Sequence, residues 1–160
     1  SVNPAGVFGP VMGKDFSTSI ELVRQLIGGK IPACPDIGFG IVDVRDVAEL
    51  HYRAMTAPDM KDERFIASGP FMKMIDVAKI LKAGLGDRAR KVPTRKMPDW
   101  ALRLLSFVRP ELKQVVNELG NVRGGSSAHA ETKLGWKMRN PEQTLIDTAN
   151  SLIERGIVKL

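Results

Sequence analysis

The residues of this chain that could carry catalysis are few, and their spacing excludes several familiar sites. No G-x-G-x-x-G pattern occurs, and no glycine stands five residues before Gly13 or Gly29, the two glycines that precede a lysine. A dinucleotide fingerprint and a phosphate-binding loop are therefore excluded. The only tyrosine is Tyr52, and the residue four positions later is Thr56. A Tyr-x-x-x-Lys pair, with both side chains on one helix face, is excluded as well.

The histidines and the cysteine favour structural roles. His51 lies on the apolar face of a predicted helix, so we expect a core histidine rather than a general base. His129 lies in a Ser/Gly-rich stretch and is predicted at the surface. The single cysteine, Cys34, stands in a proline-flanked loop, where an inert thiol is expected. One cysteine excludes a disulfide framework, and two histidines exclude most zinc sites, so we predict no metal site.

Charged residues gather at two places. Asp43 and Asp46 are three residues apart at a predicted helix start, where capping and compensation of the helix dipole are favoured over acid–base catalysis. The chain holds 24 basic and 18 acidic residues, a formal charge of +6. Five basic residues cluster at Arg88, Arg90, Lys91, Arg95 and Lys96. This basic run is either a solvated loop or an anion-recognition loop; few aromatic residues interleave with it, which disfavours a nucleic-acid partner.

The composition bounds the class of protein. The chain has 160 residues, 43% of them hydrophobic, which suits one domain with its own core. No run of about 18 to 20 apolar residues occurs, so no membrane span or membrane partner is predicted. The lone cysteine and the lack of a signal-peptide pattern favour a reducing, cytoplasmic compartment.

Hydrophobic spacing predicts short strands separated by helices. Extended segments are expected up to Phe8, over 39–42 and over 64–67, and Ser17, Asp43 and Pro98 mark helix starts. In chain order, the expected helices bury Ile20, Val23, Leu26 and Ile27; Val47, Leu50, His51, Ala54 and Met55; Met74, Val77, Ala78 and Leu81; Ala101, Leu104, Leu105 and Val108; Leu112, Val115, Val116 and Leu119; and Leu145, Ile146, Ala149, Leu152 and Ile153. This pattern indicates a helix-rich α/β fold whose sheet is incomplete within the chain.

Four segments together carry a resemblance to a known family. In chain order they are Asn3-Pro4-Ala5-Gly6-Val7-Phe8-Gly9-Pro10, Phe39 to Ala48, Arg64 to Gly69, and Lys133-Leu134-Gly135-Trp136 with Arg139, Glu142 and Ile146 in the element that follows. They resemble extended short-chain dehydrogenase/reductases of the NAD-dependent epimerase/dehydratase family, in its dihydroflavonol-reductase and aldehyde-reductase branch. Each motif is weak alone, but their order along the chain is fairly specific.

The resemblance explains the missing motifs, because in this family the glycine fingerprint, the catalytic serine and the Tyr-x-x-x-Lys pair precede the Asn-Pro segment. It implies that residues 1–160 are the substrate-binding C-terminal portion of a Rossmann-type reductase whose N-terminal dinucleotide-binding domain is absent. The start without methionine agrees with a piece of a longer protein. The parent would transfer a hydride between NADP or NAD and a small-molecule carbonyl or alcohol substrate, whereas this chain alone would bind the cofactor weakly or not at all. A truncated sheet also implies a possible homo-oligomer.

The resemblance also assigns site residues. Pro4, Ala5 and Val7 match loop positions that line the nicotinamide ring, and Ser19 matches a cofactor-proximal serine or serves only the helix end. The candidate substrate pocket is formed by Met12, Phe16, Phe71 and Met72, whose side chains could surround an apolar carbonyl compound. No catalytic residue is assigned. Trp136 is expected in the core, and Arg45 either approaches the substrate or faces solvent.

Two other functions remain open. One is a non-enzymatic basic binding or regulatory module that uses the basic run. The other is a family member that has lost catalysis and acts as a sensor.

Overall fold

The architecture is a helix-rich α/β arrangement, seen here in a computed structural model that describes residues 1–13 and 15–159. The helices are α1 (Thr18–Ile27), α2 (Val44–Thr56), α3 (Met74–Leu85), α4 (Asp99–Val108), α5 (Lys113–Asn117), α6 (Ala128–Leu134) and α7 (Pro141–Glu154), with 3-10 turns η1 (Gly86–Ala89) and η2 (Pro110–Leu112). The strands are β1 (Val2–Pro4), β2 (Gly6–Phe8), β3 (Gly38–Asp43), β4 (Phe65–Ala67) and β5 (Phe71–Lys73). Helices therefore dominate, and no described strand exceeds six residues.

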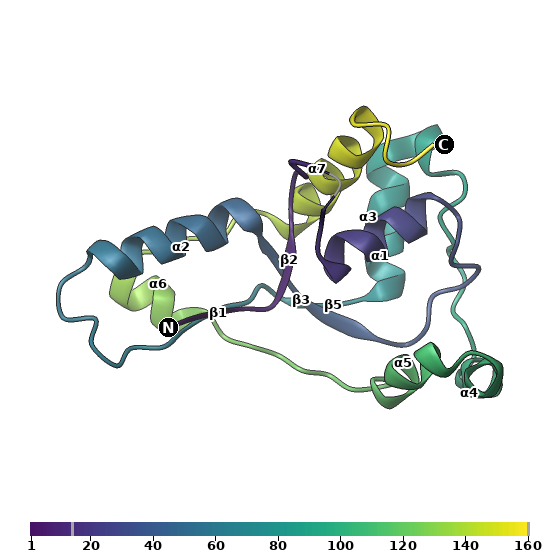
Figure 1. Cartoon of the computed structure of the whole chain (residues 1–160), viewed down its shortest axis with the longest axis horizontal. Helices are drawn as coiled ribbons and strands as arrows, with labels where there is room; N and C mark the ends of the chain where they lie inside the picture. The colour runs from purple at the N-terminus through teal and green to yellow at the C-terminus, as the bar shows by residue number, and fades with distance from the viewer. Residues whose placement is uncertain (14, 160) are drawn as a thin grey trace.

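The strands form two small sheets. In the first, β1 pairs in parallel with β4. In the second, β3 lies between β2, which is parallel to it, and β5, which is antiparallel. Only Ala5 separates β1 from β2, so one extended segment passes from the first sheet to the second (Figure 1). This crossing places the end of β2 beside the first turn of α2, because α2 begins directly after β3.

Two apolar clusters hold the chain together. The larger cluster joins α1, α3 and α7 around side chains such as Val23, Leu81 and Leu152. The smaller cluster joins β1, β4, α2 and α6 around Trp136 and Leu50. Figure 1 shows the two groups of helices on opposite sides of β2 and β3. The predicted buried stripes of α1, α3 and α7 are confirmed, apart from Ile146 and Ile153, which are half-buried.

The contact of α3 with α7 is close at a glycine. A Cβ atom at Gly84 would stand 2.5 Å from Cδ1 of Ile146 on α7. This distance is far below an ordinary van der Waals contact, so any side chain at position 84 would force the Ile146 side chain to move.

The predicted buried face of α2 is partly wrong. Leu50 is fully buried and Val47 and Ala54 are half-buried, but His51 is exposed and Met55 is 83% exposed. Asp46 is buried in their place. The buried face is turned toward Asp46 because that residue contacts the segment before α7, a contact that helical spacing cannot reveal.

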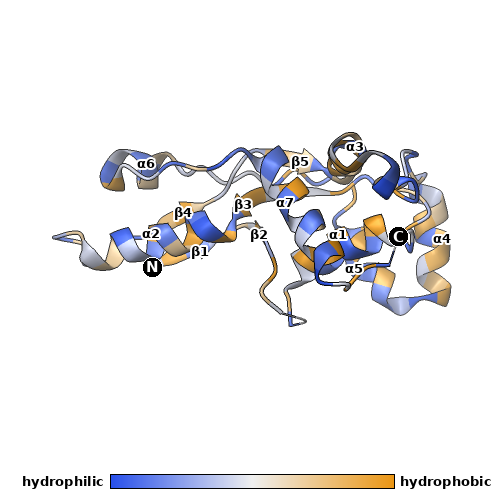
Figure 2. Ribbon diagram, turned by 90° about the horizontal axis from the view of Figure 1, so that it is seen from above, coloured by the Kyte–Doolittle hydropathy of each residue, from blue (hydrophilic) through white to orange (hydrophobic). Residues whose placement is uncertain are grey.

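The predicted face of α4 is also wrong. Leu102 and Ser106 are buried, whereas Leu104, Leu105 and Val108 are exposed. The main neighbours of α4 are η2 and α5, so little covers the rest of the helix. Figure 2 shows α4 at one end of the molecule, with apolar residues along the helix. The helix predicted after Pro110 is a 3-10 turn followed by α5, and Leu112, Val115, Val116 and Leu119 are only half-buried.

Three elements were not predicted from the sequence, namely β5, η1 and α6. The stretch that contains His129 is the helix α6, which ends at Gly135 in a left-handed conformation. His129 itself is exposed, as expected, and its ring stacks on Phe65. Within the described part of the chain, no helix is long and apolar enough to cross a membrane.

Candidate functional site

A groove of about 330 Å³ opens where β2 ends and α1 begins. Its walls come from the end of β2, the loop after it, the first residues of α1 and the first residue of α2. The lining residues are Val7, Phe8, Gly9, Pro10, Val11, Met12, Asp15, Phe16, Ser17, Ile20 and Val44. Most of these side chains are apolar, so the groove suits a small apolar compound.

Three predicted site residues meet in this groove. Val7 is half-buried, Phe16 is half-buried against the larger cluster, and Met12 is 92% exposed at the rim. Val7 and Met12 were assigned to different ligands, the cofactor and the substrate, and in the fold both line the same groove.

The other predicted residues lie elsewhere. Pro4 is exposed at the end of β1, and the Ala5 N–H donates to the Ala67 carbonyl at 2.9 Å. Ser19 is half-buried in the first turn of α1 but does not line the groove. Phe71 borders a separate hollow of only about 10 Å³, and Met72 packs against the larger cluster. A third, open hollow of about 420 Å³ beside α6 contains none of the predicted residues.

Several groove residues were missed by the sequence reasoning. Asp15, Ser17 and Ile20 lie close in sequence to Phe16, so their proximity could have been inferred. Ser17 caps α1, but its hydroxyl makes no capping hydrogen bond. Val44 comes from another segment, and nothing in its local sequence indicates that it borders the groove.

The segment that would face a nicotinamide ring offers an apolar surface. Pro4 is exposed, and Ala5 and Val7 are half-buried. The Ala5 amide is already paired with Ala67. Of the three residues, Val7 lines the groove, whereas Pro4 and Ala5 lie outside it.

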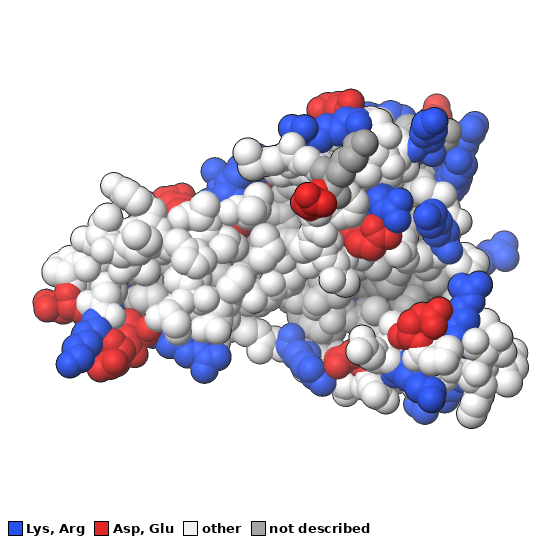
Figure 3. All heavy atoms as spheres, viewed as in Figure 1, with Lys and Arg blue, Asp and Glu red and all other residues white. Residues whose placement is uncertain are grey.

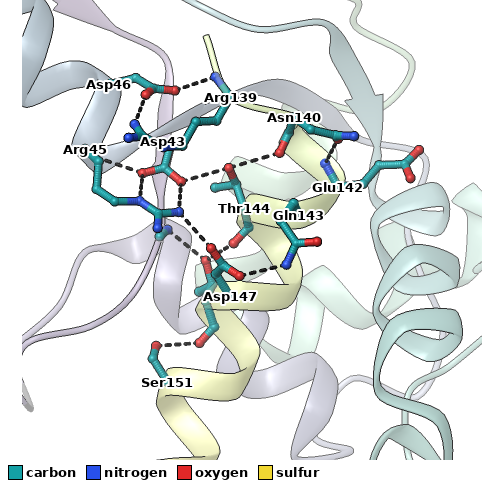
Figure 4. Close-up of polar contacts among 12 residues, drawn as sticks. Asp43, Arg45, Asp46, Arg139, Asn140, Glu142, Gln143, Thr144, Asp147 and Ser151 are labelled. Atoms are coloured by element: carbon teal, nitrogen blue, oxygen red, sulfur yellow. Dashed lines mark hydrogen bonds and ion pairs between the residues drawn. The ribbon is translucent and has the colours of Figure 1, made fainter.

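A polar network fixes the element that borders the groove. The Asp43 side chain is buried and accepts hydrogen bonds from the Arg45 amide at 2.9 Å and from Nε and Nη2 of Arg45. Oγ1 of Thr144 donates to the same carboxylate at 2.9 Å, and Arg45 also pairs with Asp147 on α7 (Figure 4). The capping role predicted for Asp43 is confirmed. Because its guanidinium is held by the carboxylates of Asp43 and Asp147, Arg45 joins α2 to α7.

Asp46 lies in the first turn of α2, as predicted, and its carboxylate makes a further contact. Its carboxylate is buried and accepts hydrogen bonds from the Arg139 amide at 2.7 Å and from the Arg139 guanidinium (Figure 4). Its backbone carbonyl accepts a hydrogen bond from Nε1 of Trp136 at 2.8 Å. Trp136 is fully buried, as predicted. These contacts connect α2 to the segment between α6 and α7.

Cys34 is a buried thiol, whereas His51 is exposed and not in the core as predicted. Cys34 is buried, and burial raises the pKa of its thiol, which disfavours the reactive thiolate. Nδ1 of His51 lies 2.8 Å from its own helix's Val47 carbonyl. Across residues 1–13 and 15–159, no group of three His, Cys, Asp or Glu side chains could hold a metal ion.

The five residues of the basic run are exposed. Between residues 88 and 113 the chain has eight basic and two acidic residues, so this stretch alone carries a net +6, equal to the formal charge of the whole chain. Figure 3 shows lysines and arginines gathered along the side of the molecule where this stretch approaches α4.

In sequence, this chain is similar to known reductases. No protein-family model matches the sequence. The chain is 30% identical over 162 aligned positions to NADPH-dependent methylglyoxal reductase GRE2 of Saccharomyces cerevisiae, covering 96% of this chain and 42% of that protein. It is 31% identical over 107 positions to ketoreductase azaE of Aspergillus niger, covering 62% and 32% of the two chains.

Solved structures agree with this relationship. The crystal structure of yeast methylglyoxal/isovaleraldehyde reductase Gre2 in complex with NADPH aligns with a TM-score of 0.69 at 30% identity, over 98% of this chain and 44% of that one. A nucleoside-diphosphate-sugar epimerase from Pseudomonas aeruginosa shares the fold at a TM-score of 0.76 and 16% identity, over 99% and 49% of the two chains. The chain thus spans less than half the length of these relatives. With its four motifs in family order, the chain is similar in sequence and fold to part of the extended short-chain dehydrogenase/reductases.

Proposed function

We propose that this chain is the substrate-binding part of an NADPH-dependent oxidoreductase that reduces a small carbonyl compound, or oxidises the matching alcohol, by hydride transfer. The observation that carries the proposal is the apolar groove formed by Val7, Met12 and Phe16. It lies in the segment with the family's Asn-Pro motif, in a chain 30% identical to a methylglyoxal reductase. The yeast relative is a methylglyoxal/isovaleraldehyde reductase, and both of these compounds are small carbonyl compounds.

In this proposal the chain supplies the surroundings of the reaction. When bound, NADPH would supply the hydride. Pro4, Ala5 and Val7 would form an apolar wall against its nicotinamide ring, with Ser19 nearby. Met12 and Phe16 would exclude water from the carbonyl compound, and Phe71 and Met72 would reach it only if the ligand extends beyond the groove.

The reacting groups would lie on a second portion of the protein. The chain spans 42% of the yeast relative, and we propose that residues 1–160 work with a dinucleotide-binding portion like the rest of that length. The cofactor's phosphates would bind there, so we expect little NADPH affinity in this chain alone. The lone cysteine continues to favour the cytoplasm as the compartment.

A chimaera tests the activity directly. We join the part of yeast Gre2 that precedes its alignment with this chain to residues 1–160. Since the Gre2 portion would supply the cofactor site and the reacting groups, the chimaera is expected to oxidise NADPH at least tenfold faster with isovaleraldehyde than without it. Loss of absorbance at 340 nm measures the rate.

The control is the 160-residue chain alone, which should give no oxidation dependent on isovaleraldehyde. Circular dichroism and NADPH binding establish that the chimaera is folded. A folded chimaera that binds NADPH but shows no aldehyde-dependent oxidation would contradict the proposed function.

A second candidate function is a basic binding module, favoured by the concentration of the net charge between residues 88 and 113. A gel-shift assay with mixed oligonucleotides separates the two. The reductase proposal predicts no shift at about 150 mM salt, because a sequence-independent phosphate contact would weaken steeply with salt. A salt-dependent shift that disappears in the double variant Arg90→Glu, Lys91→Glu would favour the module.

A further inference from the structure

Three hydroxyl side chains form a row on one face of α7. Thr144, Thr148 and Ser151 are spaced four and three residues apart, and all three are buried. The Thr148 hydroxyl donates to the Thr144 carbonyl at 2.7 Å, and the Ser151 hydroxyl donates to the Thr148 carbonyl at 2.8 Å. A hydroxyl has a single proton to donate. Since both protons are used within the helix, the two oxygens can only accept a further hydrogen bond.

The loop after β2 supplies the matching donors. The Gly9 N–H donates to Oγ1 of Thr148 at 2.7 Å, and the Val11 N–H donates to Oγ of Ser151 at 3.0 Å. Both contacts are buried, and Pro10 between them has no N–H to satisfy. Every backbone N–H group from residue 9 to residue 11 therefore donates a hydrogen bond to a side chain of α7. These same residues form one wall of the groove.

The opposite side of the loop is also held. Gly9 has φ +133°, and a Cβ atom there would lie 2.7 Å from Cγ1 of Val44 and 3.3 Å from Oδ1 of Asp43. The third hydroxyl of the row, on Thr144, donates to Asp43 at 2.9 Å. The wall is thus clamped between α7 and the first turn of α2, and Figure 4 shows the polar side of this clamp.

We infer that Thr148 and Ser151 are positioning residues for the groove, which set the place of the Gly9–Met12 wall without lining the groove themselves. The inference rests on the proposed function only in taking the groove as the substrate site. A valine at position 148 keeps the shape of the side chain but leaves the Gly9 N–H buried without an acceptor. That donor must then move toward water, and the wall moves with it.

The test compares Thr148→Val with Thr148→Ser in the 160-residue chain. We expect amide hydrogen exchange at Gly9 to become at least tenfold faster in the valine variant, while amides in the core of α3 change less than twofold. Isovaleraldehyde, titrated while the Met12 methyl resonance is followed, is expected to bind at least fivefold more weakly. The serine variant restores the acceptor oxygen and should stay within twofold of the wild type in both measurements.

Two results would overturn the inference. One is unchanged exchange at Gly9 in the valine variant. The other is exchange that rises equally at Gly9 and across α3, which would indicate a general loss of stability. If the wild type binds no isovaleraldehyde, the assignment of the groove in the proposed function fails, while the exchange rates at Gly9 still decide whether Thr148 positions the wall.

Discussion

Replacing Trp136 with alanine is expected to lower the free energy of unfolding by about 3–5 kcal/mol, the usual cost of removing a buried aromatic side chain. Trp136 is fully buried among Val42, Leu50 and Phe65. Its Nε1 donates to the Asp46 carbonyl at 2.8 Å. The substitution therefore leaves a cavity and takes the hydrogen-bond donor from a carbonyl in the first turn of α2. Urea unfolding followed by circular dichroism measures the loss.

The other tryptophan provides the control. Trp100 on α4 is 70% exposed, so Trp100→Ala should change the stability by no more than about 0.5 kcal/mol. Similar losses in the two variants would mean that Trp136 is not the centre of the smaller cluster.

Replacing Asp43 with alanine is expected to cost about 2–3 kcal/mol at pH 7. The substitution removes the cap of α2, worth about 1 kcal/mol, and the buried acceptor of Arg45 and Thr144. Breaking a fully buried pair costs about 3–5 kcal/mol. The loss here should be smaller because Arg45 is 40% exposed and keeps Asp147 as a partner.

The pH dependence of this loss identifies its cause. Burial raises the pKa of Asp43, but the hydrogen bonds from Arg45 and Thr144 outweigh burial and hold this pKa below its usual value. The folded protein therefore binds the proton more weakly than the unfolded chain does. The stabilisation is complete above the unfolded pKa of about 3.9 and is lost as the pH falls through the lower folded pKa.

The difference in unfolding free energy between the wild type and Asp43→Ala should consequently shrink as the pH is lowered from 7 into this acidic range. Asp147→Ala is the matched control, since it removes the other carboxylate on Arg45 at a half-exposed site and should cost less than about 1 kcal/mol. A difference for Asp43→Ala that stays constant down to pH 2 would show that the charge of Asp43 does not stabilise the fold.

Part of the candidate site could be predicted because it is local. Val7, Met12 and Phe16 lie within ten residues, on a strand end and the loop after it, so a motif in this segment already places them together. The buried stripes of α1, α3 and α7 were also predictable. In each of these helices the apolar residues repeat at helical spacing, and the larger cluster covers that face.

Other features depended on partners that are distant in sequence. Periodicity shows that a helix has an apolar face but not whether another element covers it, so the exposed face of α4 was predicted as buried. Asp46 is buried because Trp136 and Arg139 contact it from 90 and 93 residues away.

The sequence by itself thus determined the resemblance to a reductase family, the order of most helices and strands, and the segment that forms most of the groove. Only the tertiary structure decided that Val44 borders that groove, that Phe71 and Met72 lie outside it, and that Thr148 and Ser151 hold its wall. The physical reason is that local spacing and propensity act within a few residues. Hydrogen bonds and packing between distant segments exist only once the chain has folded.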